Sequence, residues 1–379
     1  MSSVGRYRAT RKDGLSMKIN VKTLKATINN LLRNTKGAEA YFKAYGENAI
    51  ITVANRQCIG AAKVEVISAE PNEEFAISGK FLSEMLGSLD SDEVVIQKKD
   101  NMVEVKGGRS RWSLVALSNV APTYTPVKSP EFVLGFSEDR YKEIMARAVP
   151  FVATEETISA FNGVSVVVDG DKCSIYGATR SCFSRQTFRI SEAVEEKKVV
   201  VLWREIAALS LPSDVQWRFS TNTVEVVSGN ERYTMPLLVA APPAFEKVIP
   251  DLSNAKSVIL PKGGFFDAVE RVGLCARVVE SSAIHMTLND QTVNFYACSE
   301  MIGDAEESVA TLNRTGIDGE KVGVSARLIE KIVKAASAVK VKMTYAGNPL
   351  WPLLFENDSA TNDSDVEWLA VVAPVRLKN

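Results

Sequence analysis

The chain has 379 residues, which is too long for one ordinary domain and indicates two or three. Hydrophobic residues make up 46% and charged residues 24%, so the chain can bury sizeable cores and an intrinsically disordered protein is excluded. No apolar run approaches the roughly 18 residues of a membrane span, which argues against a membrane protein. The formal net charge is −1, so a surface for nucleic acid would have to gather its positive charge on one face.

The first predicted elements are an arm and a helix. Residues 1–16 are basic and polar without the apolar segment of a secretory signal, so we expect a flexible arm. A helix is predicted at 24–33, where Leu24, Ile28, Leu31 and Leu32 form an apolar stripe. Farther along, a short strand leads through Lys80 into an amphipathic helix. The proline-rich stretch 122–130 indicates a linker.

The same order of elements then recurs twice. Helices are predicted at 138–149 and 265–277, the second with an apolar stripe of Phe266, Val269, Val272 and Gly273. An alternating strand at 164–168 is expected to end at a turn formed by Asp169 and Gly170. Short strands again lead through a basic residue into a helix, at Arg204 and Arg327, and a second proline-rich linker covers 242–250.

These recurrences define a threefold internal repeat. Lys80, Arg204 and Arg327 follow one another at spacings of 124 and 123 residues. The chain is therefore predicted to hold three units of roughly 120 residues, each with two helices and many strands. The predicted boundaries are 17–130, 131–251 and 252–379, after the arm at 1–16.

Several observations argue against an enzyme and a metal site. The one histidine, His285, alternates with apolar neighbours as on a partly buried strand, and neither Ser281 nor Ser282 lies in a nucleophile motif. The glycine pairs at 107–108 and 263–264 are not parts of a phosphate-binding loop. The cysteines are odd in number and lack a C-x-x-C spacing, which fits a reducing, cytoplasmic protein without cofactors. They are Cys58, Cys173, Cys182, Cys275 and Cys298.

The recurring basic residue stands where local electrostatics disfavour it. The N-terminus of a helix carries a partial positive charge, so a cation there is mildly unfavourable. Any single helical cation is most simply a solvated side chain. Because the choice recurs at Lys80, Arg204 and Arg327, we expect these residues to contact phosphates, which is a sequence-independent mode of binding.

Three short motifs resemble one known family. Residues 108–114, G-R-S-R-W-S-L, are similar to its G-R-S-R-[FW]-S-L, and 161–164, F-N-G-V, to its L-N-G-[VM]. Residues 372–377, V-A-P-V-R-L, resemble its V-M-P-[MV]-R-L. The order and spacing of these motifs agree with the threefold repeat. The chain thus resembles the DNA polymerase III beta subunit, the bacterial sliding clamp, from about residue 17 to 377.

The resemblance implies an α+β fold of three clamp domains, each with two helices inside and antiparallel sheets outside. Two subunits would close head-to-tail into a homodimeric ring, which removes exposed sheet edges. Such a ring encircles double-stranded DNA without regard to sequence and has no reaction of its own. Its expected partners are a DNA polymerase and a clamp loader, and no membrane is involved.

The resemblance also assigns three groups of residues. The DNA-facing positions are Lys36, Lys80, Arg204 and Arg327, whereas Glu155 replaces a polar DNA contact of the family and leaves that contact in doubt. The dimer interface would join Arg109, Arg111 and Trp112 to Glu300, Asp304, Glu306 and Glu307. The pocket for partner peptides would comprise Phe161, Ala178, Arg180, Phe183, Pro243, Val248, Leu350, Pro352, Val372, Pro374, Val375, Arg376 and Leu377.

One stretch departs from the family, and other functions stay open. The family's T-D-G-H-R-L appears as A-T-R-S-C-F at 178–183, which suggests a different preferred peptide or a phage-encoded clamp that serves its own polymerase. A three-subunit ring of the proliferating-cell nuclear antigen type has two domains per subunit, so three repeats argue against it. The alternatives from other classes are a duplicated enzyme with an inter-domain pocket and a clamp-fold scaffold that does not act on DNA.

Overall fold

A computed structural model describes residues 16–67, 74–118, 122–153, 159–202, 209–238, 240–277, 283–358 and 365–377. Arg204, Glu155, Ser281, Ser282 and the arm up to residue 15 lie outside the described residues. The chain forms two compact units. The first comprises Met1–Glu138 with Ala208–Pro236, and the second Asp139–Ala207 with Leu237–Asn379. The predicted second domain, 131–251, thus contributes strands to both units.

The first unit contains two antiparallel sheets. The four-stranded sheet has the order β1 (Ser16–Asn20), β6 (Glu93–Lys99), β7 (Met102–Gly107), β8 (Ser110–Val115). The eight-stranded sheet has the order β5 (Glu74–Ser78), β2 (Glu39–Tyr45), β3 (Asn48–Ala54), β4 (Ile59–Glu65), β14 (Glu231–Pro236), β13 (Thr223–Ser228), β12 (Val215–Phe219), β9 (Phe132–Phe136). Pairing of Ile59 with Thr234 joins its two halves across 175 residues of chain. β8 ends its sheet, so one of its edges has no neighbouring strand within the unit.

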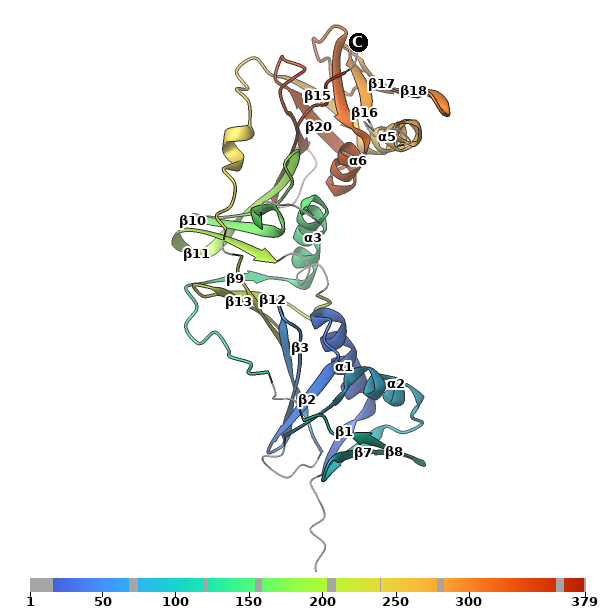
Figure 1. The fold of residues 1–379 in the computed structure, drawn as a ribbon. Coiled ribbons are helices and arrows are strands. Elements are labelled where there is room, and N and C mark those ends of the chain that lie inside the picture. The colour runs from blue at the N-terminus through green and yellow to red at the C-terminus, as the bar shows by residue number, and fades with distance from the viewer. Residues whose placement is uncertain are drawn as a thin grey trace, which may run out of the picture. The chain divides into compact units, whose positions relative to one another are not determined.

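Two helices cover the strands of the first unit, and they pack against each other (Figure 1). α1 (Val21–Thr35) begins where the side chain of Asn20 accepts a hydrogen bond from the backbone N–H of Thr23. α2 is Gly79–Ser88. Gly79 lets the two helices approach closely, because a Cβ at this residue would lie 2.8 Å from the Leu32 side chain. The predicted helix is confirmed, with Leu24, Ile28 and Leu31 fully buried and Leu32 partly buried.

The second unit also contains two antiparallel sheets. The six-stranded sheet has the order β10 (Gly163–Ala178), β11 (Cys182–Leu202), β22 (Glu367–Val372), β21 (Leu353–Asn357), β20 (Lys340–Tyr345), β15 (Lys256–Pro261). The four-stranded sheet has the order β18 (Gly303–Ala310), β17 (Thr292–Ser299), β16 (Ala283–Leu288), β19 (Glu320–Ser325). β18 ends this sheet in the same way that β8 ends its own.

The predicted turn at Asp169 and Gly170 is wrong. β10 runs through these residues from Gly163 to Ala178, and β11 pairs with it on both sides of them. The pairing register shifts between Val168 and Lys172, and Gly170 has φ +57°. Asp-Gly favours positive φ in a bulge as well as in a turn, so the sequence signal marks an irregularity within a long strand.

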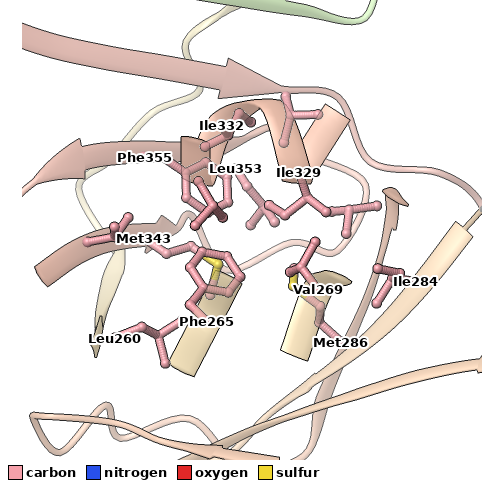
Figure 2. Packing of buried hydrophobic residues seen from close by; sticks show 14 of the residues in the cluster. Leu260, Phe265, Val269, Ile284, Met286, Ile329, Ile332, Met343, Leu353 and Phe355 are labelled. Atoms are coloured by element: carbon pink, nitrogen blue, oxygen red, sulfur yellow. The ribbon is translucent and has the colours of Figure 1, made fainter. Parts of the chain in front are cut away.

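Among the described residues, the α-helices of the second unit are α3 (Glu138–Ala148), which begins at the boundary between the units, α5 (Lys262–Ala276) and α6 (Ala326–Ala335). α5 and α6 pack against each other and enclose an apolar core with the strands (Figure 2). Phe265 is fully buried there, with its ring centroid 5.6 Å from that of Phe295 and 6.3 Å from that of Phe355. The predicted stripe placed Phe266 on this face, but Phe266 is only partly buried at the margin of the core.

The two pairs of helices have the same construction. α1 and α5 each have 15 residues, and α2 and α6 each have 10 residues and follow a serine N-cap, Ser78 or Ser325. Lys80 and Arg327 are each the second residue of the shorter helix. The predicted order of strand, basic residue and helix is therefore confirmed at both places. The third instance, at Arg204, lies outside the described residues.

Candidate functional site

A small hollow opens on the second unit where three distant segments meet beside Phe161. Its volume is about 100 Å³. One wall is the turn that joins β10 to β11, a second is the segment with the short 3-10 helix Phe245–Val248, and a third is the end of β22. The lining residues are Phe161, Thr179, Arg180, Ser181, Cys182, Phe183, Pro243, Phe245, Val248, Val371 and Ala373.

Aromatic rings form the floor of the hollow. Phe245 stacks on Tyr176 with ring centroids 4.3 Å apart, and Phe183 lies 5.4 Å from Phe245. All three side chains are buried, and Leu369 and Val371 belong to the same cluster. The rings hold one another in place, so the floor is an apolar surface that exists before any partner binds.

The turn beside the hollow is fixed by Thr179. Its hydroxyl oxygen accepts hydrogen bonds from the backbone N–H groups of Ser181, at 3.2 Å, and Cys182, at 3.3 Å. Its own backbone N–H donates to the carbonyl oxygen of Cys182 at 2.8 Å. Burial raises the pKa of the Cys182 thiol, so this thiol keeps its proton at physiological pH. Arg180 is exposed at the tip of this turn.

An ion pair borders the aromatic floor. The Glu246 carboxylate accepts a hydrogen bond from Arg185 at 2.7 Å and another from the Tyr176 hydroxyl at 3.1 Å. Burial raises the pKa of Tyr176, so its hydroxyl keeps its proton and donates. Glu246 is thereby held toward Arg185, and its neighbour Val248 stays half exposed at the hollow. The rim is thus partly apolar, and the carboxylate of Glu246 beside it is already engaged by Arg185 and Tyr176.

The structure brings together five of the residues predicted for the peptide pocket, namely Phe161, Arg180, Phe183, Pro243 and Val248. Two others lie in cores: Ala178 in the aromatic cluster and Val372 in the apolar core beside α5 and α6. Val372 points away because side chains alternate along β22, so its neighbour Val371 lines the hollow instead. The remaining predicted residues do not line the hollow: Leu350, Pro352, Pro374, Val375, Arg376 and Leu377.

Sequence reasoning missed six lining residues. They are Thr179, Ser181, Cys182, Phe245, Val371 and Ala373. One signal was available in the sequence: Phe245 is an aromatic residue two positions after Pro243, in a segment already assigned to the pocket.

The predicted DNA-facing cations lie on or beside helices. Lys36 follows α1 with φ 56°, and its backbone N–H donates to the Leu32 carbonyl at 2.9 Å. Lys36, Lys80 and Arg327 are exposed, and none of them forms an ion pair with another described residue. α1 itself contains no acidic residue. These side chains are therefore available to an external anion.

Other helical cations are neutralised within the chain. Arg147 is buried and pairs with Glu143, and Arg271 pairs with Glu307. Lys334 pairs with Glu330 at 2.6 Å. The charge left for an external partner is thus concentrated on fewer residues than the helical cations of the sequence suggest.

The predicted interface residues lie on the two strands that end their sheets, except Arg109 and Glu300, which lie in the turns just before these strands. On the side of β8, the buried Glu104 of β7 pairs with Arg111, Lys106 and Lys99. The hydrogen bond from Lys106 is the main reason that the pKa of Glu104 falls to about 2. Arg109 is exposed and Trp112 is partly buried.

On the side of β18, three of the predicted acidic residues, Glu300, Asp304 and Glu306, are exposed and have no ion-pair partner among the described residues. Glu307 differs, because Arg271 binds its carboxylate through two nitrogens and lowers its pKa. At the two sheet edges, the charge without an ion-pair partner among the described residues is therefore positive at Arg109 and negative at Glu300, Asp304 and Glu306.

The described residues do not assemble a metal site or a catalytic group around the histidine. Within the described ranges no group of three His, Cys, Asp or Glu side chains could hold a metal ion. His285 lies partly buried on β16, with its ring edge-on to Tyr296 at 5.9 Å. Burial lowers its pKa, and Lys321 adds to the shift. No helix of the described chain is long and apolar enough to cross a membrane.

Comparison with known proteins finds relatives of this chain in sequence and in fold. No family model matches the chain. In sequence, it is 19% identical over 289 residues to a beta sliding clamp of Staphylococcus aureus, covering 75% of this chain and 76% of that protein. The beta sliding clamp of Staphylococcus epidermidis is 20% identical over 291 residues, with the same coverage. The chain is thus similar in sequence to beta sliding clamps, at low identity.

Solved structures agree with this relationship. A DNA polymerase sliding clamp from Pseudomonas aeruginosa superposes with a TM-score of 0.87 at 17% identity. The DNA polymerase III beta chain of Streptococcus pneumoniae gives 0.86 at 16% identity. Each comparison covers 96% of this chain and 100% of the other. The α+β clamp fold predicted from the sequence is thereby confirmed.

Proposed function

We propose that the chain is a DNA sliding clamp, a non-catalytic processivity factor that encircles duplex DNA and tethers a polymerase to it. The clamp fold over 96% of the chain carries this proposal, because it includes the full length of the solved clamps. The three predicted domains, 17–130, 131–251 and 252–379, would be the repeating units of this fold.

Two subunits would form the ring. β8 and β18 each leave one strand edge without a neighbour in their own unit, and an exposed edge is satisfied by pairing with another strand. Arg109 on one subunit would face Glu300, Asp304 and Glu306 on the next, while Trp112 supplies apolar surface. Opposite charges of this kind fix the register of an interface more than they strengthen it.

DNA would be held through its phosphates. Exposed cations at Lys36, Lys80 and Arg327, together with Arg204, form contacts that do not depend on base sequence. Such contacts have nearly the same free energy at every position along the duplex, so the ring can slide. This arrangement explains how a chain with a net charge of −1 can bind a polyanion.

The hollow is proposed as the docking site for the polymerase and the clamp loader. Its volume of about 100 Å³ is well below the roughly 300–1,000 Å³ of small-molecule sites, so it suits one apolar side chain of a peptide. This size argues against the alternative of an enzyme whose substrate would occupy this site. Anchoring by a side chain in an aromatic-floored hollow is a common mode of peptide recognition.

Topological binding to DNA tests the proposal without a clamp loader. The protein is incubated with linear duplex DNA biotinylated at both ends, streptavidin is then added to block the ends, and the complex is washed in high salt. A ring that has threaded onto the DNA remains bound after the wash and is released when the duplex is cut in the middle. Protein that is added after streptavidin is the control and should wash off. Retention that survives cutting, or no retention in either order, would contradict the proposal.

A further inference from the structure

A relay of hydrogen bonds runs from the core of the first unit to the surface of α1. The buried Glu231 carboxylate on β14 accepts a hydrogen bond from the Tyr233 hydroxyl at 2.6 Å and another from the Asn30 amide at 3.0 Å. The side-chain oxygen of Asn30 accepts a hydrogen bond from the Arg33 guanidinium at 2.9 Å. Asn30 and Glu231 are 201 residues apart in the chain. The relay therefore connects a buried carboxylate of β14 to an exposed cation of α1.

The chemistry of its neighbours fixes the orientation of the Asn30 amide. A carboxylate can only accept hydrogen bonds, so Asn30 must turn its nitrogen toward Glu231 and its oxygen toward Arg33. Burial raises the pKa of Tyr233, so its hydroxyl keeps its proton and donates to Glu231. The same hydroxyl accepts a hydrogen bond from the Asn34 amide at 2.8 Å. Glu231 is thus held from two sides, and Asn30 has one orientation that satisfies both of its neighbours.

Arg33 lies on the exposed side of α1, near α2. Its side chain is exposed and forms no ion pair with another described residue. Asn29, one turn before Arg33, accepts a hydrogen bond from Ser83 of α2, and Ser83 is one turn after Lys80. Residues three or four apart share one face of a helix, so Arg33 and Lys80 border the same contact between the two helices. Arg33 is therefore on the surface that also carries a predicted DNA-facing cation.

The relay holds a cation that has donors to spare. A guanidinium has five N–H groups in a planar fork, and the hydrogen bond to Asn30 uses one nitrogen of Arg33. The remaining donors suit the oxygens of a phosphate. No carboxylate of α1 competes for them, because this helix contains no acidic residue. Fixing a long side chain in advance also reduces the entropy that is lost when it binds.

We infer that Arg33 is a further residue that contacts the DNA backbone, and that Asn30 and Glu231 position its guanidinium for a phosphate. This inference rests on the proposed function, in which the chain holds duplex DNA through its phosphates. A cation in the last turn of a helix also interacts favourably with the helix dipole. The experiment must therefore separate binding to DNA from the stability of α1.

A double-mutant cycle makes this separation. Arg33→Gln, Asn30→Ala and the double variant are compared with the wild type by fluorescence anisotropy on a labelled linear duplex with open ends, at a series of salt concentrations. The control cycle combines Arg33→Gln with Asn29→Ala, because Asn29 bonds Ser83 instead of Arg33. Thermal unfolding of every variant measures the stability that each change removes. Arg33→Gln alters only an exposed side chain, so its salt dependence can be measured whatever Asn30→Ala does to the fold.

Arg33→Gln should flatten the slope of log affinity against log salt by about 0.9 per subunit, the effect of one lost phosphate contact. Asn30→Ala keeps every charge but frees the Arg33 side chain, so it should weaken binding by about two- to tenfold. In the Arg33→Gln background, Asn30→Ala should cause no further loss of affinity. Any loss from Asn29→Ala should be the same with and without Arg33, because independent changes add.

Two results would overturn the inference without affecting the proposed function. An unchanged slope for Arg33→Gln would remove the contact between Arg33 and DNA. Equal losses from Asn30→Ala with and without Arg33 would remove the positioning role, because a purely structural defect adds to the loss of the cation. Failure of the wild type both to bind this duplex and to thread onto end-blocked DNA would instead overturn the proposed function, and the inference with it.

Discussion

The backbone N–H of Val375 donates a 2.8 Å hydrogen bond to the carbonyl oxygen of Gly323, which seats the C-terminal segment on β19. The contact is close because Gly323 has no side chain. A Cβ at this position would lie 2.5 Å from both the Val375 carbonyl oxygen and the Leu377 side chain. Two residues that the sequence assigned to the peptide pocket, Val375 and Leu377, thus depend on a glycine more than 50 residues earlier in the chain.

Replacing Gly323 with alanine should displace the C-terminal segment. The added methyl group overlaps backbone and side-chain atoms, which costs about 1–3 kcal/mol in a packed site. Hydrogen exchange at the Val375 amide should accelerate, and the midpoint of chemical unfolding should fall. Gly135→Ala on β9 is the matched control, because a Cβ there meets no atom within 4 Å. Equal protection of Val375 in the wild type and in Gly323→Ala would show that the glycine does not hold the segment.

Phe265→Ala should destabilise the second unit strongly. The ring is fully buried between Phe295 and Phe355, so its removal leaves a cavity and is expected to cost about 3–5 kcal/mol. Phe266→Ala removes the same group from the margin of the core and should cost less. Chemical denaturation followed by circular dichroism measures both. A larger loss of stability for Phe266→Ala than for Phe265→Ala would show that Phe266 is the core residue, as the sequence predicted.

The bounds of the helices were predictable to within a few residues. Which of two adjacent side chains on a helix is buried was not always predictable. Phe265 and Phe266 both fit a helical stripe, and only the strands packed against α5 decide which one is buried. Val371 and Val372 present the same ambiguity on a strand, because an apolar run buried on both faces has no alternation to read. In both cases tertiary packing resolves what periodicity leaves open.

The hollow was harder to predict than the fold. Its lining comes from the segments around Phe161, Arg180, Phe245 and Val371, which are far apart in the sequence. The resemblance to the clamp family predicted some residues in or next to each of these segments. The pairing of β11 with β22, which brings Cys182 opposite Val372, follows from no local pattern. Of the residues missed, Ser181, Cys182, Val371 and Ala373 owe their places to that contact between β11 and β22.

Glu104 should make the stability of the first unit sensitive to acid. Its pKa is lowered from an ordinary 4.5 to about 2, chiefly by Lys106, then by Lys99 and Arg111. A carboxyl group with a depressed folded-state pKa stabilises the fold above its unfolded-state pKa, and this contribution is lost as pH falls toward the folded value. Thermal unfolding should therefore show Glu104→Gln less stable than the wild type at pH 7, with the difference shrinking between about pH 5 and pH 2. Glu84→Gln, an exposed carboxylate on α2, is the control. A difference that does not change with pH would contradict this account.

Charge reversal at Arg109 should weaken the proposed dimer. Arg109→Glu places a negative charge opposite Glu300, Asp304 and Glu306 in the proposed joint, so the dimer should dissociate at about fivefold higher concentration or more in sedimentation velocity. Arg111→Glu is a less specific test, because it also breaks the pair with the buried Glu104 within the subunit.

Arg56→Glu provides the control for Arg109→Glu. Arg56 is an exposed cation in the turn between β3 and β4 of the same unit and lies outside the proposed joint. Its reversal changes the net charge by the same amount, so it accounts for general electrostatic effects. If Arg109→Glu and Arg56→Glu sediment alike, the joint does not involve Arg109.

Removing the cations at the starts of α2 and α6 should weaken binding to DNA in a salt-dependent way. Each neutralised phosphate contributes about 0.9 to the slope of log affinity against log salt, so Lys80→Ala with Arg327→Ala should flatten the slope by nearly two per subunit. Lys334→Ala is the matched control on α6, because Lys334 is already neutralised by Glu330 at 2.6 Å. The slope is measured by anisotropy on a labelled linear duplex with open ends between low and moderate salt, and on two duplexes of different sequence. An unchanged slope in the double variant would remove these residues from the DNA-binding surface, and weaker binding confined to one duplex would indicate base recognition instead of phosphate recognition.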